Sequence, residues 1–244
     1  MRCLISLAIF ALLGAGFPAT AASFDCGKAL TVQEKAICAD SKLSQLDEDT
    51  AAAYTRLRAQ LTPAGAAKVQ QDQREWLAWL QQTCPDRNDP QRLHLCLSEA
   101  YSTRFYLLRS GLKRAGGITF FPRLKVVTTP DKEQRRSLSD PGFGIGWFSW
   151  PEIDQPTPRQ ASWNAAVRQE AIGMALDPDD KRQQPADFDP SSVADADVTI
   201  VYRLRAANEQ FISVGLENGS YRHGMPHSNV ETISFEWWSN GDVL

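Results

Sequence analysis

The chain has 244 residues, a formal net charge of −3 at pH 7, 43% hydrophobic residues and 23% charged residues. These are ordinary values for a globular protein. A mildly acidic chain has little electrostatic attraction for a phosphate backbone, which argues against a nucleic-acid partner. The small net charge favours a basic partner only weakly.

Residues 1–22 are typical of a secretory signal peptide. Arg2 precedes an apolar run from Cys3 to Leu13, and small residues follow. Both Ala19-Thr20-Ala21 and Thr20-Ala21-Ala22 fit a signal-peptidase site. The apolar run is too short to span a bilayer, and the chain has no other long apolar run. We therefore expect a periplasmic or secreted protein with no membrane span after signal removal.

Four cysteines follow the signal at symmetric positions. Eleven residues separate Cys26 from Cys38, and eleven separate Cys84 from Cys96. An even number of cysteines in an exported chain predicts disulfides. Zinc is the rival interpretation, but the close Cys-x2-Cys pair of most zinc sites is absent. We expect disulfides, no metal and no cofactor.

Residues 24–112 show the apolar periodicity of helices. Thr31 and Glu34 form a capping-box pattern, which predicts a short first helix that ends near Cys38. The next helix carries a single apolar stripe from Leu43 to Leu61.

A third and a fourth helix have the same kind of start signal. Thr62-Pro63 and Asp89-Pro90 each place an N-cap residue before a proline at the first helical position. In the third helix, Trp76 and Trp79 are expected to pack against other helices. The fourth helix is expected to end near Leu112, so this half of the protein should be a helical hairpin or bundle over residues 23–112.

The short turn at Thr62 should make the second and third helices an antiparallel hairpin. Cys38 precedes this hairpin and Cys84 follows it, so both lie at the same end. On this geometry we favour pairing of Cys38 with Cys84 and of Cys26 with Cys96. Pairing within each half, Cys26 with Cys38 and Cys84 with Cys96, is the open alternative.

The second half has a different composition and predicts an α+β domain with an antiparallel sheet over residues 119–244. Ala115-Gly116-Gly117 indicates a linker at residues 113–118. Residues 162–176 have a helical pattern, and residues 177–197 are acidic, rich in proline and loop-like. Glu217-Asn218-Gly219 and Asn240-Gly241 are expected to be turns. The strand-forming runs are 119–127, 198–204, 211–216 and 232–238.

The turn from Tyr221 to His227 contains two of the three histidines of the chain. His223 and His227 are four residues apart, but Gly224 lies between them and excludes the helical metal pair. A metal site would need a third ligand, for which Glu231 or Asp242 are the nearest acidic residues. A turn that caps strands is the plain interpretation; a recognition loop on a rigid scaffold is the functional one.

The sequence offers no catalytic group. Four serines near the histidines lack the Gly-x-Ser-x-Gly elbow of a hydrolase: Ser213, Ser220, Ser228 and Ser234. The pattern Gly142-x-Gly144-x-Gly146 follows Pro141 and has no helix signal after it, which indicates a turn and not a phosphate loop. We therefore predict a protein without catalytic residues.

One set of motifs is spread over the whole first half of the chain. Its members are Cys26, Glu34-x-x-Ile37-Cys38, Leu43-x-x-Leu46-Asp47, Tyr54, Gln73-Arg74-x-Trp76-Leu77, Cys84, Cys96 and Tyr101. This pattern resembles the N-terminal domain of LprI-type lysozyme inhibitors over roughly residues 24–112. It departs from the family at Gln81-Gln82-Thr83, where an Arg-Asp pair is often found, and in the loop 85–90.

A second set of motifs lies in the other half. Its members are Ser149-Trp150-Pro151-Glu152-Ile153, Trp163-Asn164-Ala165-Ala166-Val167, Phe211-Ile212-Ser213-Val214 and the run from Tyr221 to His227. These resemble a domain of RsiV-type anti-sigma factors and of some exported polysaccharide deacetylases. In the last motif, His223 replaces a glycine and Met225-Pro226 replaces an alanine of that family.

Both resemblances imply the same partner, a lysozyme-type muramidase. They imply an exported, non-catalytic binding protein whose candidate contact residues are Tyr221, Arg222, His223, Gly224 and His227. A surface of the helical half around residues 47–49 is a second candidate. The alternative functions are an envelope stress sensor or scaffold without an enzyme partner, and an enzyme that acts on cell-wall sugars.

Overall fold

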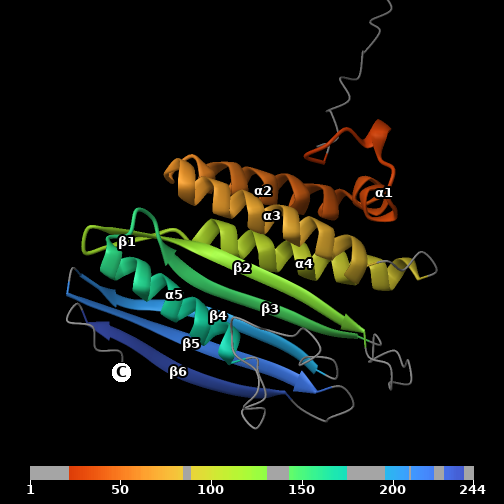
Figure 1. Cartoon of the computed structure of the whole chain (residues 1–244). Coiled ribbons are helices and arrows are strands. Elements are labelled where there is room, and N and C mark those ends of the chain that lie inside the picture. The colour runs from red at the N-terminus through yellow and green to blue at the C-terminus, as the bar shows by residue number, and fades with distance from the viewer. Residues whose placement is uncertain are drawn as a thin grey trace, which may run out of the picture.

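The computed structural model describes residues 22–84, 89–130, 143–174, 196–208, 210–222 and 228–238. Figure 1 shows a layer of helices stacked on a twisted sheet, with one further helix against the sheet's other face. The predicted fold class is confirmed: a disulfide-linked helical region precedes a six-stranded, mostly antiparallel sheet with a helix.

The helical layer contains a short 3-10 helix, η1 (Cys26–Lys28), and four α-helices: α1 (Val32–Ala39), α2 (Ser41–Arg58), α3 (Pro63–Thr83) and α4 (Pro90–Ser110). The predicted start signals are confirmed. Thr31 Oγ1 accepts from Glu34 N at 3.1 Å, and the Glu34 carboxylate accepts from Thr31 N at 2.8 Å. Thr62 and Asp89 cap α3 and α4 with their side-chain oxygens.

The favoured disulfide pairing was wrong, and the alternative is found. Cys26 pairs with Cys38 and Cys84 pairs with Cys96, each with 5.8 Å between Cα atoms. The reasoning that α1 lies near the end of α3 holds, because Gln33 Nε2 donates to the Cys84 carbonyl oxygen at 2.8 Å. Each cysteine nevertheless has a closer partner along its own chain segment, and closing a short loop costs less chain entropy than closing a long one.

The sheet contains six strands in the order of the chain: β1 (Lys113–Ala115), β2 (Ile118–Pro130), β3 (Phe143–Ile153), β4 (Ala196–Ala207), β5 (Phe211–Arg222) and β6 (Asn229–Trp238). Neighbouring strands are antiparallel except β3 and β4, which are parallel. Helix α5 (Pro158–Gly173) lies between them in the chain, as the crossover of a parallel pair requires.

The segment expected to be a linker, residues 113–118, contains β1 and the turn to β2. Gly116 and Gly117 form this turn with φ of 55° and 77°, which favour glycine. A Cβ on Gly116 would lie 2.5 Å from the Ala207 carbonyl oxygen, so the turn also sits close against the end of β4.

Two segments predicted as turns are strands. Gly144 and Gly146 belong to β3, where Gly146 is closely packed: a Cβ there would lie 2.5 Å from a methyl of Val127. Glu217-Asn218-Gly219 continues β5, because β4 and β6 pair with these residues from both sides. Pairing with neighbouring strands overrides the weak local strand preference of glycine and asparagine. Asn240-Gly241 lies outside the described residues.

The helices pack directly on one face of the sheet. Trp76 packs edge-on against Tyr101 of α4, with ring centroids 5.1 Å apart, as predicted for a helix–helix contact. Trp79 instead meets Trp147 of β3 at 5.9 Å, so it joins helix to sheet. On the opposite face, Trp163 of α5 is fully buried against Phe120.

Buried polar contacts also connect the two layers. The Asp154 carboxylate after β3 accepts from the backbone N–H of Thr62 at 2.9 Å and fixes the turn before α3. Glu152 of β3 pairs with both Lys68 of α3 and Arg123 of β2. Among the described helices, none is long and apolar enough to cross a membrane.

Candidate functional site

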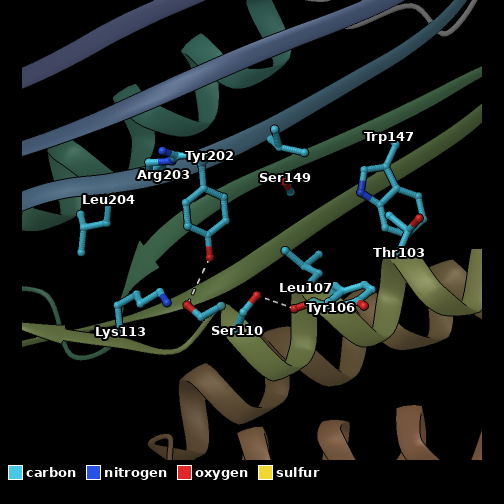
Figure 2. Close-up of a pocket in the computed structure, with 12 residues that line it drawn as sticks. Thr103, Tyr106, Leu107, Ser110, Lys113, Trp147, Ser149, Tyr202, Arg203 and Leu204 are labelled. Atoms are coloured by element: carbon cyan, nitrogen blue, oxygen red, sulfur yellow. Dashed lines mark hydrogen bonds between the residues drawn. The ribbon is translucent and has the colours of Figure 1, made fainter. Parts of the chain in front are cut away.

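A groove of about 520 Å³ lies between helix α4 and strands β3 and β4 (Figure 2). The residues that line it are Thr103, Tyr106, Leu107, Ser110, Gly111, Lys113, Trp147, Ser149, Val201, Tyr202, Arg203 and Leu204.

The last two turns of α4 form one wall of the groove. Tyr106 and Leu107 each lie three or four positions from both Thr103 and Ser110, so these four residues share one face of the helix. Tyr106 is 64% exposed. Ser110 Oγ donates to the Tyr106 carbonyl oxygen at 2.5 Å, an internal bond at the end of the helix (Figure 2).

Strand β3 forms the floor. Trp147 and Ser149 point to the same face because side chains alternate along a strand. Trp147 is buried against Trp79 of α3, so the floor is rigidly supported. Ser149 Oγ donates to the Ile200 carbonyl oxygen of β4 at 2.9 Å and so joins the floor to the opposite wall.

Strand β4 forms the second wall of the groove, and the edge of β4 on its β3 side is open there. The register pairs β3 with β4 only from Gly146 opposite Val198 to Phe148 opposite Ile200. Beyond this point, β4 continues to Ala207 and remains paired with β5 on its other side. Residues 201–204 all line the groove. Consecutive side chains point to opposite faces, so the backbone edge of β4 is part of the wall.

One side chain of β4 crosses to the helix. Tyr202 points toward α4, and its hydroxyl donates to the Gly111 carbonyl oxygen at 3.2 Å (Figure 2). Burial raises the pKa of Tyr202, so the phenol stays protonated and keeps this bond at physiological pH. The bond holds β4 and the end of α4 at a constant separation.

The charge of the groove is positive. Lys113 and Arg203 are exposed, and no acidic side chain is among the described residues that line the groove. Within the described part of the chain, no ion pair or hydrogen bond involves either cation. The groove thus combines aromatic and aliphatic walls, an exposed strand edge and two available cations.

The contact residues predicted from sequence lie elsewhere. Tyr221 and Arg222 are the last two residues of β5, opposite Asp197 and Ala196 at the start of β4. The groove is at the middle of β4, so these two residues are not brought into it. The predicted contacts His223, Gly224 and His227 lie outside the described residues, as does Asp242.

Asp47, the first residue of the second predicted surface, has a structural role. Its carboxylate is buried and accepts from Tyr101 Oη at 2.9 Å and from Ser23 N at 2.6 Å. Burial, reinforced by the Asp47 charge, raises the pKa of Tyr101. Both carboxylate oxygens are therefore occupied inside the protein, and Asp47 is not free to bind a partner.

Gln73 of the Gln-Arg-x-Trp motif is also structural. Its Oε1 accepts from Arg104 Nε at 2.9 Å, and Arg104 is only 1% exposed. Burial lowers the pKa of Arg104 to about 10. Arg104 lies on the buried stripe of α4 with Leu97, Tyr101 and Leu108, and that spacing is the signal that marks it in the sequence.

Lys113 and Arg203 were missed by the sequence analysis. Lys113 belongs to the segment expected to be a linker, and Arg203 belongs to an alternating strand in which an outward cation is ordinary. Only the packing of α4 beside β4 brings them to one groove. No local pattern could have identified them.

Comparison with known proteins finds one family similar to the helical region. Residues 26–108 match the family model described as Lysozyme inhibitor LprI. No curated protein matches the chain.

Two solved structures show weak likeness to part of the chain. A DUF3298 family protein from Pseudomonas aeruginosa PAO1 covers 52% of this chain and 55% of its own, with 10% identity and a TM-score of 0.34. A member of the same family from Bacteroides fragilis NCTC 9343 covers 52% and 58%, with 11% identity and a TM-score of 0.31. The match thus spans little more than half the length of either protein. The family model therefore matches the helical region alone: residues 26–108 of this chain are similar to the family described as Lysozyme inhibitor LprI.

Proposed function

We propose that this chain is an exported, non-catalytic protein that binds and inhibits a lysozyme-type muramidase in the periplasm or outside the cell. The observation that carries the proposal is the LprI match over residues 26–108. The matched segment coincides with the four helices and both disulfides. Paired cysteines are typical of proteins in oxidising compartments, which supports export.

A muramidase cleft offers a defined target. Glycoside hydrolases of this kind use two carboxyl groups that flank the scissile bond. A cation on the inhibitor that reaches these carboxyl groups would compete with the substrate. An arginine suits this role best, since its planar guanidinium forms two parallel hydrogen bonds with a carboxylate.

The end of β5 is the proposed contact surface, through Tyr221, Arg222, His223, Gly224 and His227. Strand β5 is paired with β4 on one side and β6 on the other. Tyr221 and Arg222 continue β5 beyond Ser220, the last residue paired with β6, and are paired with β4 alone. Residues that a rigid scaffold holds at its margin commonly carry recognition. In this proposal, Arg222 binds the acidic cleft, and Tyr221, His223, Gly224 and His227 are further contacts.

The test is an inhibition assay. The chain from residue 23 to 244, expressed in an oxidising compartment, is titrated into a cell-wall lysis assay with several classes of lysozyme. We expect saturable inhibition near a stoichiometric ratio with at least one class. Flat curves for every class would overturn the proposal and favour a sensor or scaffold role.

The variant Arg222→Ala tests the proposed contact surface. We expect inhibition to weaken by at least about tenfold, which corresponds to about 1.4 kcal/mol of binding free energy. Arg205→Ala is the matched control, because Arg205 is an exposed arginine of the same sheet and lies toward the other end of β4. Equal inhibition constants for the two variants would place the contact surface away from β5.

A further inference from the structure

We propose that the groove between α4 and β4 binds an extended, acidic peptide segment of a partner protein, which adds a short strand along the open edge of β4. This function is separate from muramidase inhibition and does not depend on it. The site lies in the middle of the sheet, away from Tyr221 and Arg222.

The first argument is the free strand edge. Along its β5 side, β4 is paired from Ala196 to Ala207. On its β3 side, pairing ends at Ile200, and no described strand pairs with that edge from Val201 onward. An open edge presents unpaired N–H and C=O groups that an extended peptide can satisfy. Four residues of this edge line the groove, roughly 13 Å of strand, which matches a peptide of about four residues.

The second argument is that the groove is already formed. Tyr202 is tied to Gly111 by a hydrogen bond and Ser149 is tied to Ile200, so both ends of the wall are fixed. The buried Trp147 supports the floor. A peptide would enter without rearranging the sheet, and a volume of 520 Å³ falls in the usual range of ligand pockets.

The third argument is charge. Lys113 and Arg203 are exposed, belong to different strands and are both among the residues that line the groove, and no described lining residue is acidic. Arg205, two positions further along β4, instead donates to Ser234 Oγ of β6 at 2.6 Å and does not line the groove. Two available cations beside an open edge favour a peptide with carboxylates at alternating positions, because alternate residues of a strand share one face.

Binding is measured by fluorescence anisotropy with the full oxidised chain and a labelled, end-capped hexapeptide of alternating glutamate and valine. We expect saturable binding that weakens at higher ionic strength. Lys113→Glu and Arg203→Glu should each weaken binding by at least about tenfold, whereas Arg205→Glu should change it by no more than about twofold. All three side chains are exposed, and thermal unfolding checks that the variants fold. Equal effects of Arg203→Glu and Arg205→Glu would overturn the proposal.

A second probe separates strand pairing from simple charge attraction. The same hexapeptide with N-methylated alternate backbone nitrogens keeps its charges but cannot donate the strand hydrogen bonds. We expect it to bind at least about tenfold more weakly. If it binds equally well, or if an anionic polysaccharide competes as strongly as the peptide, the groove is a general anion site and the proposal fails.

Hydrogen exchange locates the peptide. Saturation with the hexapeptide should slow amide exchange in residues 201–204, the part of β4 that lines the groove. Protection confined to the end of β5 would contradict the proposal.

Discussion

Arg123 of β2 holds Asp72 of α3 by two hydrogen bonds, from Nε to Oδ2 at 2.9 Å and from Nη2 to Oδ1 at 3.0 Å. The same carboxylate accepts from the backbone N–H of Leu124 at 3.0 Å. Burial by itself lowers the pKa of Arg123, but the hydrogen bonds and charges of Asp72 and Glu152 outweigh it and raise the pKa. This contact joins α3 of the helical layer to β2 of the sheet.

Removal of this anchor should destabilise the protein strongly. Asp72→Ala removes the carboxylate that accepts two hydrogen bonds from Arg123 and leaves the Leu124 N–H unpaired, while Arg123 keeps its pairing with Glu152. We therefore expect the free energy of unfolding in urea to fall by about 3 kcal/mol, the lower end of the cost of breaking a buried ion pair. Asp25→Ala is the control, since Asp25 pairs with Lys28 at an exposed site. A loss below about 1 kcal/mol for Asp72→Ala would contradict the anchoring role.

The capping box at α1 predicts a specific pH dependence. Backbone hydrogen bonds from Thr31, then Leu30, lower the pKa of Glu34 from its usual value near 4.5. The pKa of Glu34 is lower in the folded state than in the unfolded state. The stabilisation from ionised Glu34 is therefore fully present above the unfolded-state pKa and is lost as the pH falls through the folded-state pKa. Glu34→Gln should therefore cost about 1 kcal/mol at pH 7 and progressively less as pH falls below 4.5. Urea unfolding at several pH values measures the cost of Glu34→Gln, and Glu48→Gln at an exposed position is the control. An equal cost of Glu34→Gln at every pH would contradict the prediction.

The two disulfides predict a definite peptide map. Trypsin cuts between the members of both pairs, so mass spectrometry without reduction should find Cys26 peptides linked to Cys38 and Cys84 peptides linked to Cys96. A Cys38–Cys84 link would refute this connectivity.

Loss of either bridge should lower stability. The double variants Cys26→Ser with Cys38→Ser, and Cys84→Ser with Cys96→Ser, should each cost about 2–4 kcal/mol. We expect the second to cost more, because Cys84 is buried in the helical core whereas Cys26 is exposed. Urea unfolding of both variants measures this, and the reverse order would show that burial at Cys84 adds little.

Gly65 should tolerate no side chain. A Cβ there would lie 2.6 Å from Asp154 Oδ1, and Asp154 is held by Thr62. Gly65→Ala must displace this carboxylate, so we expect a loss of about 1–3 kcal/mol in unfolding free energy although alanine favours helix. Ala64→Ser, at an exposed neighbouring position, is the control. Equal stability of the two variants would show that the α3–sheet junction yields easily.

The four helices of the first half could be predicted from sequence because their signals are local. Caps such as Thr31 with Glu34, and the Thr62-Pro63 start, act between residues within one turn of each other. The motifs of the first half gave a resemblance to LprI-type inhibitors over roughly residues 24–112, and the LprI family model matches residues 26–108. This resemblance was also readable from sequence, because the motif spacings are properties of one continuous segment.

The tertiary structure alone decided the disulfide partners, strand β3 and the continuation of β5 through Gly219. Strand pairing supplied hydrogen bonds that outweigh the weak strand preference of the glycines. It also decided the groove, since Lys113 and Arg203 line one groove only because α4 packs beside the open edge of β4. Local sequence determines the helix caps and the apolar faces of the helices, because the residues that form each of them are near neighbours in the chain. The groove depends on distant segments whose separation is set by packing against a shared core.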